Sequence, residues 1–294
     1  MGILRSIGTC AALVRREGLR GWGRALRRLP QLPRFLRWHA LPPGSEVECL
    51  LEGRLRMRLS AADNSIARRI FTTGAFEPRL LAFMRASVTP GAVAVDVGAN
   101  VGVHTLTLAE SVGPGGSVHA FEPSAAYDRL TANLRLNGLD GRVRANRAAV
   151  GAAPGSLALR ECEQGYEAFT SAGRPLAHAK VTGATFDVPM VTLDRYLEEH
   201  GVSSVDFLKV DVEGYEVEVL RGARGLLGRR AVRRIMLEVS DPLLEGCGAS
   251  AGEMFELLHA AGYSTCLLDA ATGKLEACPA PRATVDSTLV AMAP

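Results

Sequence analysis

The feature that most constrains the fold is residues 92–123, where two apolar runs enclose a glycine-rich turn and a helix-length segment. Ala92–Val97 is rich in valine and apolar on both faces, which is typical of a strand buried inside a parallel sheet. Gly98–Gly102 predicts a sharp turn, Val103–Val112 a helix and Val118–Phe121 a second buried strand. This order of strand, loop, helix and strand predicts an α/β fold built on a parallel sheet.

Two carboxylates flank the turn. Asp96 lies in the first strand and Glu122 follows the second, and the turn has the pattern D-x-G-x-N-x-G with Gly98, Asn100 and Gly102. A dinucleotide site uses G-x-G-x-x-G to bring a helix N-terminus to a pyrophosphate. An acid in front of the loop would repel a pyrophosphate but can pair with the ammonium of a methionine moiety. Glu122 stands where such folds hold ribose hydroxyls, so the spacing favours S-adenosylmethionine over NAD. The alternative, that the glycines only close a tight turn, leaves Glu122 unexplained.

A later buried strand carries several ionisable residues near its carboxyl end, among them Lys209 and Asp211, and the next strand contains Glu238 near its end. Carboxyl ends of parallel strands form the ligand-binding edge of an α/β sheet. We therefore predict that Asp211, Glu238 and Lys209 are catalytic. Asp211 could orient an acceptor, accept its proton or hold a metal ion, but the pattern assigns no metal site. Glu213 and Glu216 have a simpler interpretation, as acids that favour the start of the next helix.

The composition is that of an ordinary globular protein of 294 residues, 47% of them hydrophobic, with a formal net charge of +3. This length is enough for one large α/β core and a small extension. The six cysteines show no zinc-binding spacing, so we expect free thiols in a reducing compartment. No apolar run approaches the length of about 20 residues that spans a bilayer, and the first residues lack the apolar core of a signal peptide. We expect a cytoplasmic protein.

The positive charge is concentrated at the N-terminus, where residues 1–40 contain nine arginines against one acid, Glu17. Apolar residues recur there at helical spacing, which predicts one or two amphipathic helices. Such a segment could contact an anionic membrane surface peripherally or bind an acidic partner. The alternative is a solvated arginine face on a helix packed against the main domain. Because the main domain does not interleave aromatic and basic residues, we expect no nucleic-acid partner.

We divide the chain into three parts. Residues 1–45 are the arginine-rich extension, and residues 46–90 are a β-hairpin with two helices that pack on the core. Residues 91–294 are the cofactor-binding domain, within which 156–190 interrupt the strand and helix order. We expect this interruption to be an excursion on the substrate side, since binding loops occupy such positions. Glu77 either begins a helix, where an acid complements the dipole, or faces the cofactor site.

The remaining strands complete one large sheet. Val143–Val150 is predicted as the third strand, with Arg147 and Ala148 as candidate neighbours of the adenine ring. Tyr263–Leu268 and Ser287–Met292 are predicted as the last two strands. No helix separates those two, so they must be antiparallel. The result is a sheet of seven strands, mostly parallel, with an antiparallel last strand.

Several motifs together resemble the FkbM family of S-adenosylmethionine-dependent methyltransferases: DVGANVG with FEP downstream, AAVG, TLDRYLEE and DFLKVDVEGYEVEVLRGA. The resemblance covers roughly residues 74–240 and implies a Rossmann-like class I methyltransferase fold. It implies two sets of site residues. The cofactor-contacting positions are Asp96, Gly98, Asn100, Gly102 and Glu122, and the second signature is Lys209, Asp211, Glu213 and Gly214. Many relatives have a histidine two residues after Glu238, where this chain has Ser240.

The resemblance implies methyl transfer from S-adenosylmethionine to a hydroxyl group of a sugar, glycolipid or polyketide-type small molecule. If the histidine of relatives is a base, another group must act here, and we predict Asp211 or Glu238. The absence of an N-P-P-Y motif argues against a nitrogen acceptor. Two alternatives remain: a NAD-linked oxidoreductase, and a non-catalytic binding module on the same fold.

Overall fold

The computed structural model describes residues 31–42, 44–63, 65–163, 170–174, 181–282 and 287–294. The chain divides into two compact units, Met1–Phe76 and Glu77–Pro294. The amphipathic helices expected before residue 30 lie outside the described residues. No helix in the described ranges is long and apolar enough to cross a membrane. The five cysteines in these ranges are free thiols.

Within the described residues, the smaller unit contains a β-hairpin and two helices. β1 (Glu46–Leu51) and β2 (Leu55–Ser60) are antiparallel, which confirms the hairpin expected from the alternating pattern. Alternate side chains of β2 are buried, including Met57. α3 (Leu32–Ala40) packs on α4 (Ile66–Thr73), with the ring centroids of Trp38 and Phe71 5.4 Å apart. The hairpin and its helices thus share a small core.

The larger unit is built on an eight-stranded sheet in the order β12-β11-β13-β10-β9-β3-β4-β5. Five neighbouring strands are parallel, and β13 is antiparallel to both of its neighbours, as expected for the last strand. The sheet has one strand more than predicted, the edge strand β12. The bounds are β3 (Val93–Val97), β4 (Ser117–Phe121), β5 (Val143–Asn146), β9 (Phe207–Val210), β10 (Arg234–Val239), β11 (Ser264–Leu268), β12 (Leu275–Ala277) and β13 (Ser287–Met292).

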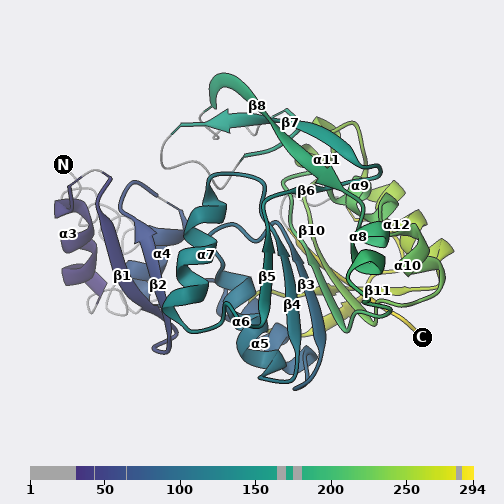
Figure 1. Cartoon of the computed structure of the whole chain (residues 1–294), viewed down its shortest axis with the longest axis horizontal. Coiled ribbons are helices and arrows are strands. Elements are labelled where there is room, and N and C mark those ends of the chain that lie inside the picture. The colour runs from purple at the N-terminus through teal and green to yellow at the C-terminus, as the bar shows by residue number, and fades with distance from the viewer. Residues whose placement is uncertain (1–30, 43, 64, 164–169, 175–180, 283–286) are drawn as a thin grey trace, which may run out of the picture. The chain divides into compact units, whose positions relative to one another are not determined.

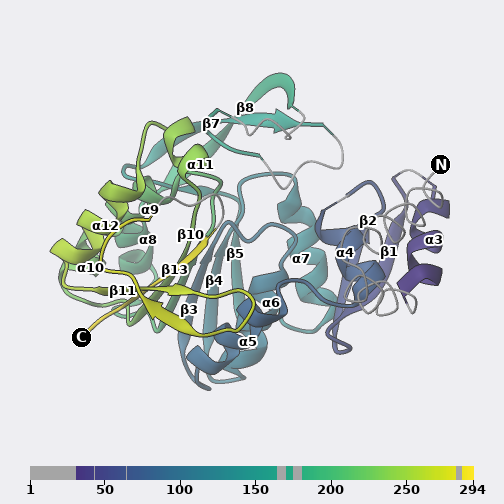
Figure 2. The same ribbon diagram turned by 180° about the vertical axis from the view of Figure 1, so that it is seen from behind.

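Helices cover both faces of this sheet. One face carries α5 (Pro78–Ser87), α6 (Val103–Val112) and α7 (Ala126–Leu136), and the other carries α8 (Leu193–Glu199), α9 (Glu216–Arg221), α10 (Arg224–Gly228) and α12 (Ala251–Ala260), as Figures 1 and 2 show from opposite sides. The inner parallel strands between them are almost completely buried, as in β9, where all four residues are enclosed. This two-sided burial explains why the strands are continuous apolar runs.

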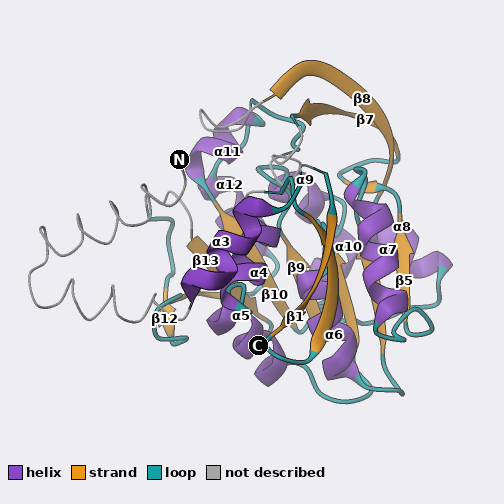
Figure 3. Cartoon of the chain, turned by 90° about the vertical axis from the view of Figure 1, so that its left-hand side faces the viewer, coloured by secondary structure: helices purple, strands orange, loops and turns teal. Residues whose placement is uncertain are grey.

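A second, three-stranded sheet extends past the carboxyl ends of the parallel strands (Figure 3). It consists of β6 (Ala149–Val150), β8 (Val181–Val191) and β7 (Gly155–Cys162), with β7 and β8 antiparallel as expected for the excursion. The prediction of one strand over Val143–Val150 is wrong. Ala149 and Val150 pair with β8 and not with the main sheet, so the chain bends at Arg147 and Ala148.

Candidate active site

Asp96 and Lys209 form a buried ion pair near the carboxyl edge of the main sheet. They lie side by side in the register of the parallel strands β3 and β9. Lys209 Nζ lies 3.2 Å from Asp96 Oδ1, and Thr105 Oγ1 of α6 donates a 2.6 Å hydrogen bond to Asp96 Oδ2. Their side chains are 2% and 0% exposed. Burying either charge alone would cost several kcal/mol, so each group makes the burial of the other possible.

Lys209 connects this pair to two loops. Its ammonium donates a 2.7 Å hydrogen bond to the Gly98 carbonyl and lies 3.3 Å from Asp211 Oδ2. Burial would lower the pKa of Lys209, but the charges of Asp211 and Asp96 outweigh it and raise that pKa above its ordinary value. Lys209 is therefore a permanent cation. Because it is enclosed, its predicted catalytic role is limited to positioning the groups that it holds.

The glycine loop lies directly against the segment after β9. Gly98 has a φ of 82°, and a Cβ placed there would be 1.7 Å from the Asp211 carbonyl oxygen. Gly102, with a φ of 97°, would place a Cβ 2.8 Å from a methyl group of Leu130 on α7. Gly98 therefore has two reasons to be glycine, its positive φ and the close approach of the neighbouring backbone. The loop thus brings the ends of β3 and β9 together.

Glu122 holds the glycine loop to the segment that follows β4. Its Oε2 accepts a 2.8 Å hydrogen bond from the Asn100 amide, and its Oε1 accepts bonds from the amide and hydroxyl of Ser124. Asn100 has a φ of 48° and accepts a bond from the Val101 amide with its side chain. A carboxylate has about four acceptor positions, so three protein donors leave about one for a ligand. The ribose contact predicted for Glu122 stays a prediction, and holding the loop is a role that the sequence did not reveal.

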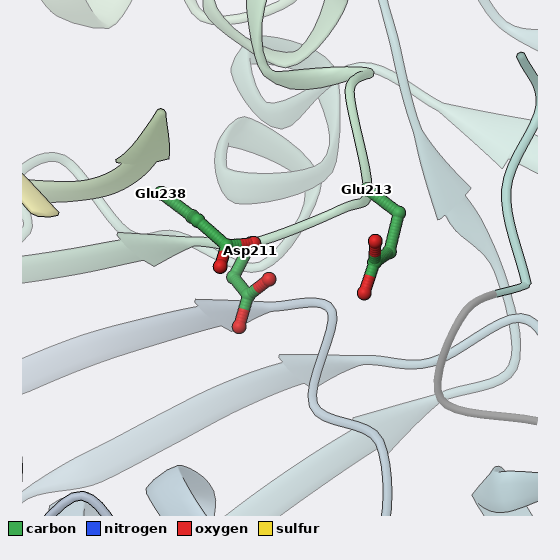
Figure 4. A group of neighbouring side chains, drawn as sticks. All are labelled: Asp211, Glu213 and Glu238. Atoms are coloured by element: carbon green, nitrogen blue, oxygen red, sulfur yellow. The ribbon is translucent and has the colours of Figure 1, made fainter. Parts of the chain in front are cut away.

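Three carboxylates gather at the carboxyl ends of β9 and β10 (Figure 4). Asp211, Glu213 and Glu238 each offer an oxygen atom, and these atoms lie within 4.8 Å of one another. The Asp211 side chain is 32% exposed, and Glu213 has a φ of 54°. A divalent cation could use such a set of oxygen atoms. The prediction that these strands bring Asp211 and Glu238 together at the sheet edge agrees with this geometry.

The charges of Asp211 and Glu238 are coupled. Burial would raise the pKa of Asp211, but the Lys209 cation outweighs it and holds that pKa below its ordinary value. The charge of Asp211, together with burial and a hydrogen bond between the two carboxyl groups, raises the pKa of Glu238 to about 11. At neutral pH Asp211 is therefore ionised, and Glu238 is a neutral acid that can donate a proton to it.

Glu216 shapes the loop that carries Glu213. Its carboxylate accepts hydrogen bonds of 3.0 Å from the Val212 amide and 3.3 Å from the Gly214 amide, and Glu216 is 2% exposed. Burial raises its pKa to about 7, against the lowering effect of these amides. This geometry agrees with the simple interpretation of Glu216 as part of a helix start.

His104 and Glu77 form a further pair that the motifs did not reveal. His104 lies in the first turn of α6, and its Nε2 is 3.1 Å from Glu77 Oε2, which precedes α5. The His104 side chain is 9% exposed and that of Glu77 is 40% exposed. The position of Glu77 at the start of a predicted helix marks it as a candidate. Its partner, His104, lies 27 residues away in the chain, and no sequence pattern near His104 marks it.

These residues fit a cationic cofactor. Five carboxyl groups, Asp96, Glu122, Asp211, Glu213 and Glu238, surround the sheet edge against one buried lysine. Even with Glu238 protonated, the carboxylates outnumber Lys209, and an environment of this sign favours the sulfonium and ammonium groups of S-adenosylmethionine. The glycine loop offers backbone without side-chain bulk beside them. Ala148, half-buried at the bend before β6, stays a prediction as a neighbour of the adenine ring.

Comparison with known families gives one match that covers more than half of the chain. Residues 96–265 match the family described as the methyltransferase FkbM domain. This range begins at the buried Asp96 and includes Glu122, Lys209, Asp211 and Glu238. The site assembled by the fold therefore lies within the matched region, whereas Glu77 lies outside it.

Curated proteins that are similar in sequence include the following three methyltransferases. Methyltransferase sdnD of Sordaria araneosa is 32% identical over 173 residues, which cover 50% of this chain and 66% of that protein. The 31-O-demethyl-FK506 methyltransferase FkbM of Streptomyces tacrolimicus is 31% identical over 199 residues, 60% of this chain and 74% of that protein. Hexuronic acid methyltransferase AglP of Haloferax volcanii is 28% identical over 175 residues, 58% of this chain and 62% of that protein.

Proposed function

The chain belongs to the family of methyltransferases with an FkbM domain, and from this premise we propose that it methylates a hydroxyl group of a sugar, glycolipid or polyketide-type small molecule. The methyl donor that this family and the site imply is S-adenosylmethionine. The observation that carries the proposal is the sheet edge itself, where carboxylates from β3, β9 and β10 meet around Lys209. This edge offers a cationic donor a net negative environment directly beside the glycine loop.

The acceptor class rests on the relatives. One relative is named for an FK506 derivative that lacks a methyl group on an oxygen atom, and another for hexuronic acid. Both names describe small, oxygen-rich molecules.

The cofactor supplies an activated methyl group on a sulfonium. Gly98 and Gly102 would let the loop turn tightly with its backbone toward the cofactor. Asn100 and Glu122 would set the loop, and Ala148 would lie toward the adenine ring. Lys209 fixes Asp96 and Asp211 in their positions. Most of the rate enhancement would come from holding the acceptor oxygen in line with the methyl group in a site shielded from water.

A screen with tritiated S-adenosylmethionine against sugars, glycolipids and polyketides tests this proposal. Incorporation of tritium into a hydroxylated compound would support it, and the Asp211→Asn variant, which loses a positioning carboxylate, should incorporate less by about 100-fold or more. Incorporation into nucleic acid or an amine, with none into hydroxylated compounds, would refute the acceptor class.

The two alternatives predict other outcomes. A NAD-linked oxidoreductase would be stabilised against heat by NADH and not by S-adenosylmethionine, since only a bound ligand raises the melting temperature. A binding module would be stabilised by S-adenosylmethionine but would transfer no methyl group to any extract.

A further inference from the structure

Methyl transfer to a hydroxyl group requires a group that takes up the hydroxyl proton, and the carboxylates at the sheet edge are poorly suited to this. Asp96 is completely enclosed behind Lys209 and Thr105. Asp211 is paired with the Lys209 ammonium, which makes it a weak base. Glu238 lies against Asp211, so its carboxyl group faces another carboxyl group and shares a hydrogen bond with it. Ser240, at the position where many relatives have histidine, is 4% exposed and has no proton-accepting nitrogen.

His104 offers the missing property. Its Nε2 faces the Glu77 carboxylate at 3.1 Å, and its Nδ1 makes no hydrogen bond with any described residue. Nδ1 is not among the polar atoms of the described residues that are both fully buried and without a hydrogen-bond partner. Because it has no such partner, it must be at least partly accessible to solvent. A histidine with one nitrogen on a carboxylate and the other nitrogen free is the arrangement that general-base catalysis uses.

The fold places this pair on the reacting side of the sheet. Thr105, the neighbour of His104 on α6, bonds Asp96, so α6 covers the face from which Asp96 projects. Lys209 lies beside Asp96 in the register of the two strands. Asp211 comes two residues after Lys209, which places the two residues on the same face of the sheet. The register of β9 and β10 then brings Glu238 beside Asp211. His104 and the three predicted catalytic residues therefore belong to one face and one edge of the sheet.

His104 and Asp211 interact electrostatically. Burial raises the pKa of Asp211, and the charge of Lys209 lowers it. The charge of His104 also lowers this pKa.

From this geometry we propose that His104 is the proton acceptor of the methyl transfer and that Glu77 positions it. The inference rests on the proposed function. In the reaction, the acceptor oxygen forms a bond to the methyl carbon, and the carbon–sulfur bond breaks with its electron pair remaining on sulfur. The hydroxyl proton passes to His104 Nδ1, the Glu77 carboxylate stabilises the resulting imidazolium, and the proton returns to solvent after product release.

The kinetic test compares His104→Gln, Glu77→Gln and the double variant, with the hydroxylated compound that incorporates most tritium in the screen as the acceptor. His104→Gln should lower kcat by about 100-fold while the KM for S-adenosylmethionine stays within about twofold. Glu77→Gln should cost about tenfold, and the double variant should be no slower than His104→Gln, because Glu77 acts only through His104. His259→Gln is the matched control: this histidine bonds Thr265 on another part of the sheet and should leave kcat unchanged. Multiplicative losses in the double variant, or a normal kcat in His104→Gln, would overturn the proposal.

A second measurement needs no acceptor. The full chain labelled with ¹⁵N-histidine is examined by NMR near neutral pH with S-adenosylhomocysteine, and His104→Gln identifies the His104 signals. The proposal requires the proton on Nε2, toward Glu77, and a bare Nδ1; a proton on Nδ1 would overturn it. Failure to bind S-adenosylhomocysteine by calorimetry would refute the proposed function instead, and the tautomer would still decide for or against His104.

Discussion

At the scale of single residues, Lys209 supplies the positive charge that pairs with the buried carboxylate of the site. It is the cation nearest to Asp96, whose carboxylate is 0% exposed. Lys209→Met keeps most of the volume and removes the charge, so Asp96 would be buried without a counter-ion. We expect a loss of about 3–5 kcal/mol in the free energy of unfolding at neutral pH, measured with urea.

The matched controls separate charge from packing. Lys274→Met changes an exposed lysine and should have little effect. Adding Asp96→Asn to Lys209→Met removes the unpaired charge and should restore much of the lost stability. If Lys209→Met alone were within about 1 kcal/mol of the wild type, the buried ion pair would contribute little to the fold.

The site residues show what residue patterns can and cannot predict. Asp211 and Glu238 could be placed together because one follows β9 and the other lies near the end of the neighbouring β10, a relation set by topology. The reach of Lys209 back to the Gly98 carbonyl could not be predicted, because it depends on the close approach of two loops. The Glu77–His104 pair was missed for the same reason, since nothing near His104 in the sequence marks its partner.

At the scale of elements, the turn between β3 and α6 has a measurable packing requirement. Gly98 and Gly91 have similar φ angles, 82° and 86°, but a Cβ at Gly91 meets nothing within 4 Å whereas one at Gly98 meets the Asp211 carbonyl. Gly91→Ala should therefore cost only backbone strain, about 1 kcal/mol. Gly98→Ala should cost several kcal/mol and abolish cofactor binding, because the ends of β3 and β9 must separate.

Thermal unfolding and calorimetry with S-adenosylmethionine measure both effects. Equal stability losses in the two variants would mean that the loops are not in contact in solution. The difference between the variants, rather than either value alone, reports the contact.

The packing of α8 on β4 predicts a pH dependence. His119 of β4 lies 3.1 Å from the Tyr196 hydroxyl of α8, and the rings of Tyr196 and His200 are stacked. Burial, with the charges of His200 and Arg144, lowers the pKa of His119 from 6.5 to about 4. Because the folded pKa is the lower one, the unfolded chain takes up this proton first as the pH falls. His119 therefore contributes full stability above about pH 6.5 and loses it as the pH falls toward about 4.

His119→Gln should remove this dependence. Between neutral pH and about pH 4.5, the wild type should lose up to about 3 kcal/mol more than the variant in urea unfolding. Tyr196→Phe is the control, because it removes the hydroxyl but keeps the histidine buried, so the pH dependence should remain. A wild type and a His119→Gln variant with parallel pH profiles would show that His119 does not titrate differently on folding.

Strands could be predicted from the sequence where their residue pattern is local and regular. β3, β4 and β9 are continuous apolar runs, and β1 and β2 alternate, so their positions follow from period and burial. β12 is three residues long and all of its residues are exposed, so it carries no pattern. The run Val143–Val150 looks like one strand, yet its last two residues pair with β8, a partner forty residues away that no local pattern identifies.

At the scale of the whole molecule, a deletion in the arginine-rich N-terminus would test whether a segment outside the matched family region has a separate role. Seven of its arginines precede residue 31, and two more, Arg34 and Arg37, are on α3. Deleting residues 1–30 would leave α3, whose Trp38 packs on Phe71 within the smaller unit. The truncated protein should therefore fold and bind S-adenosylmethionine with unchanged affinity by calorimetry.

Membrane binding should change instead. Basic residues near an anionic bilayer contribute about 1 kcal/mol each at low salt, and the attraction is screened as salt increases. The full chain should therefore sediment with vesicles of phosphatidylglycerol and phosphatidylcholine at low salt, dissociate at high salt and ignore vesicles of phosphatidylcholine alone. The truncated chain should stay in the supernatant throughout. If the full chain also stays in the supernatant at low salt, the arginines do not bind anionic membranes, and a packing role is the interpretation that remains. If both proteins sediment, the basic surface responsible lies beyond residue 30, and neutralising Arg34 and Arg37 becomes the next comparison.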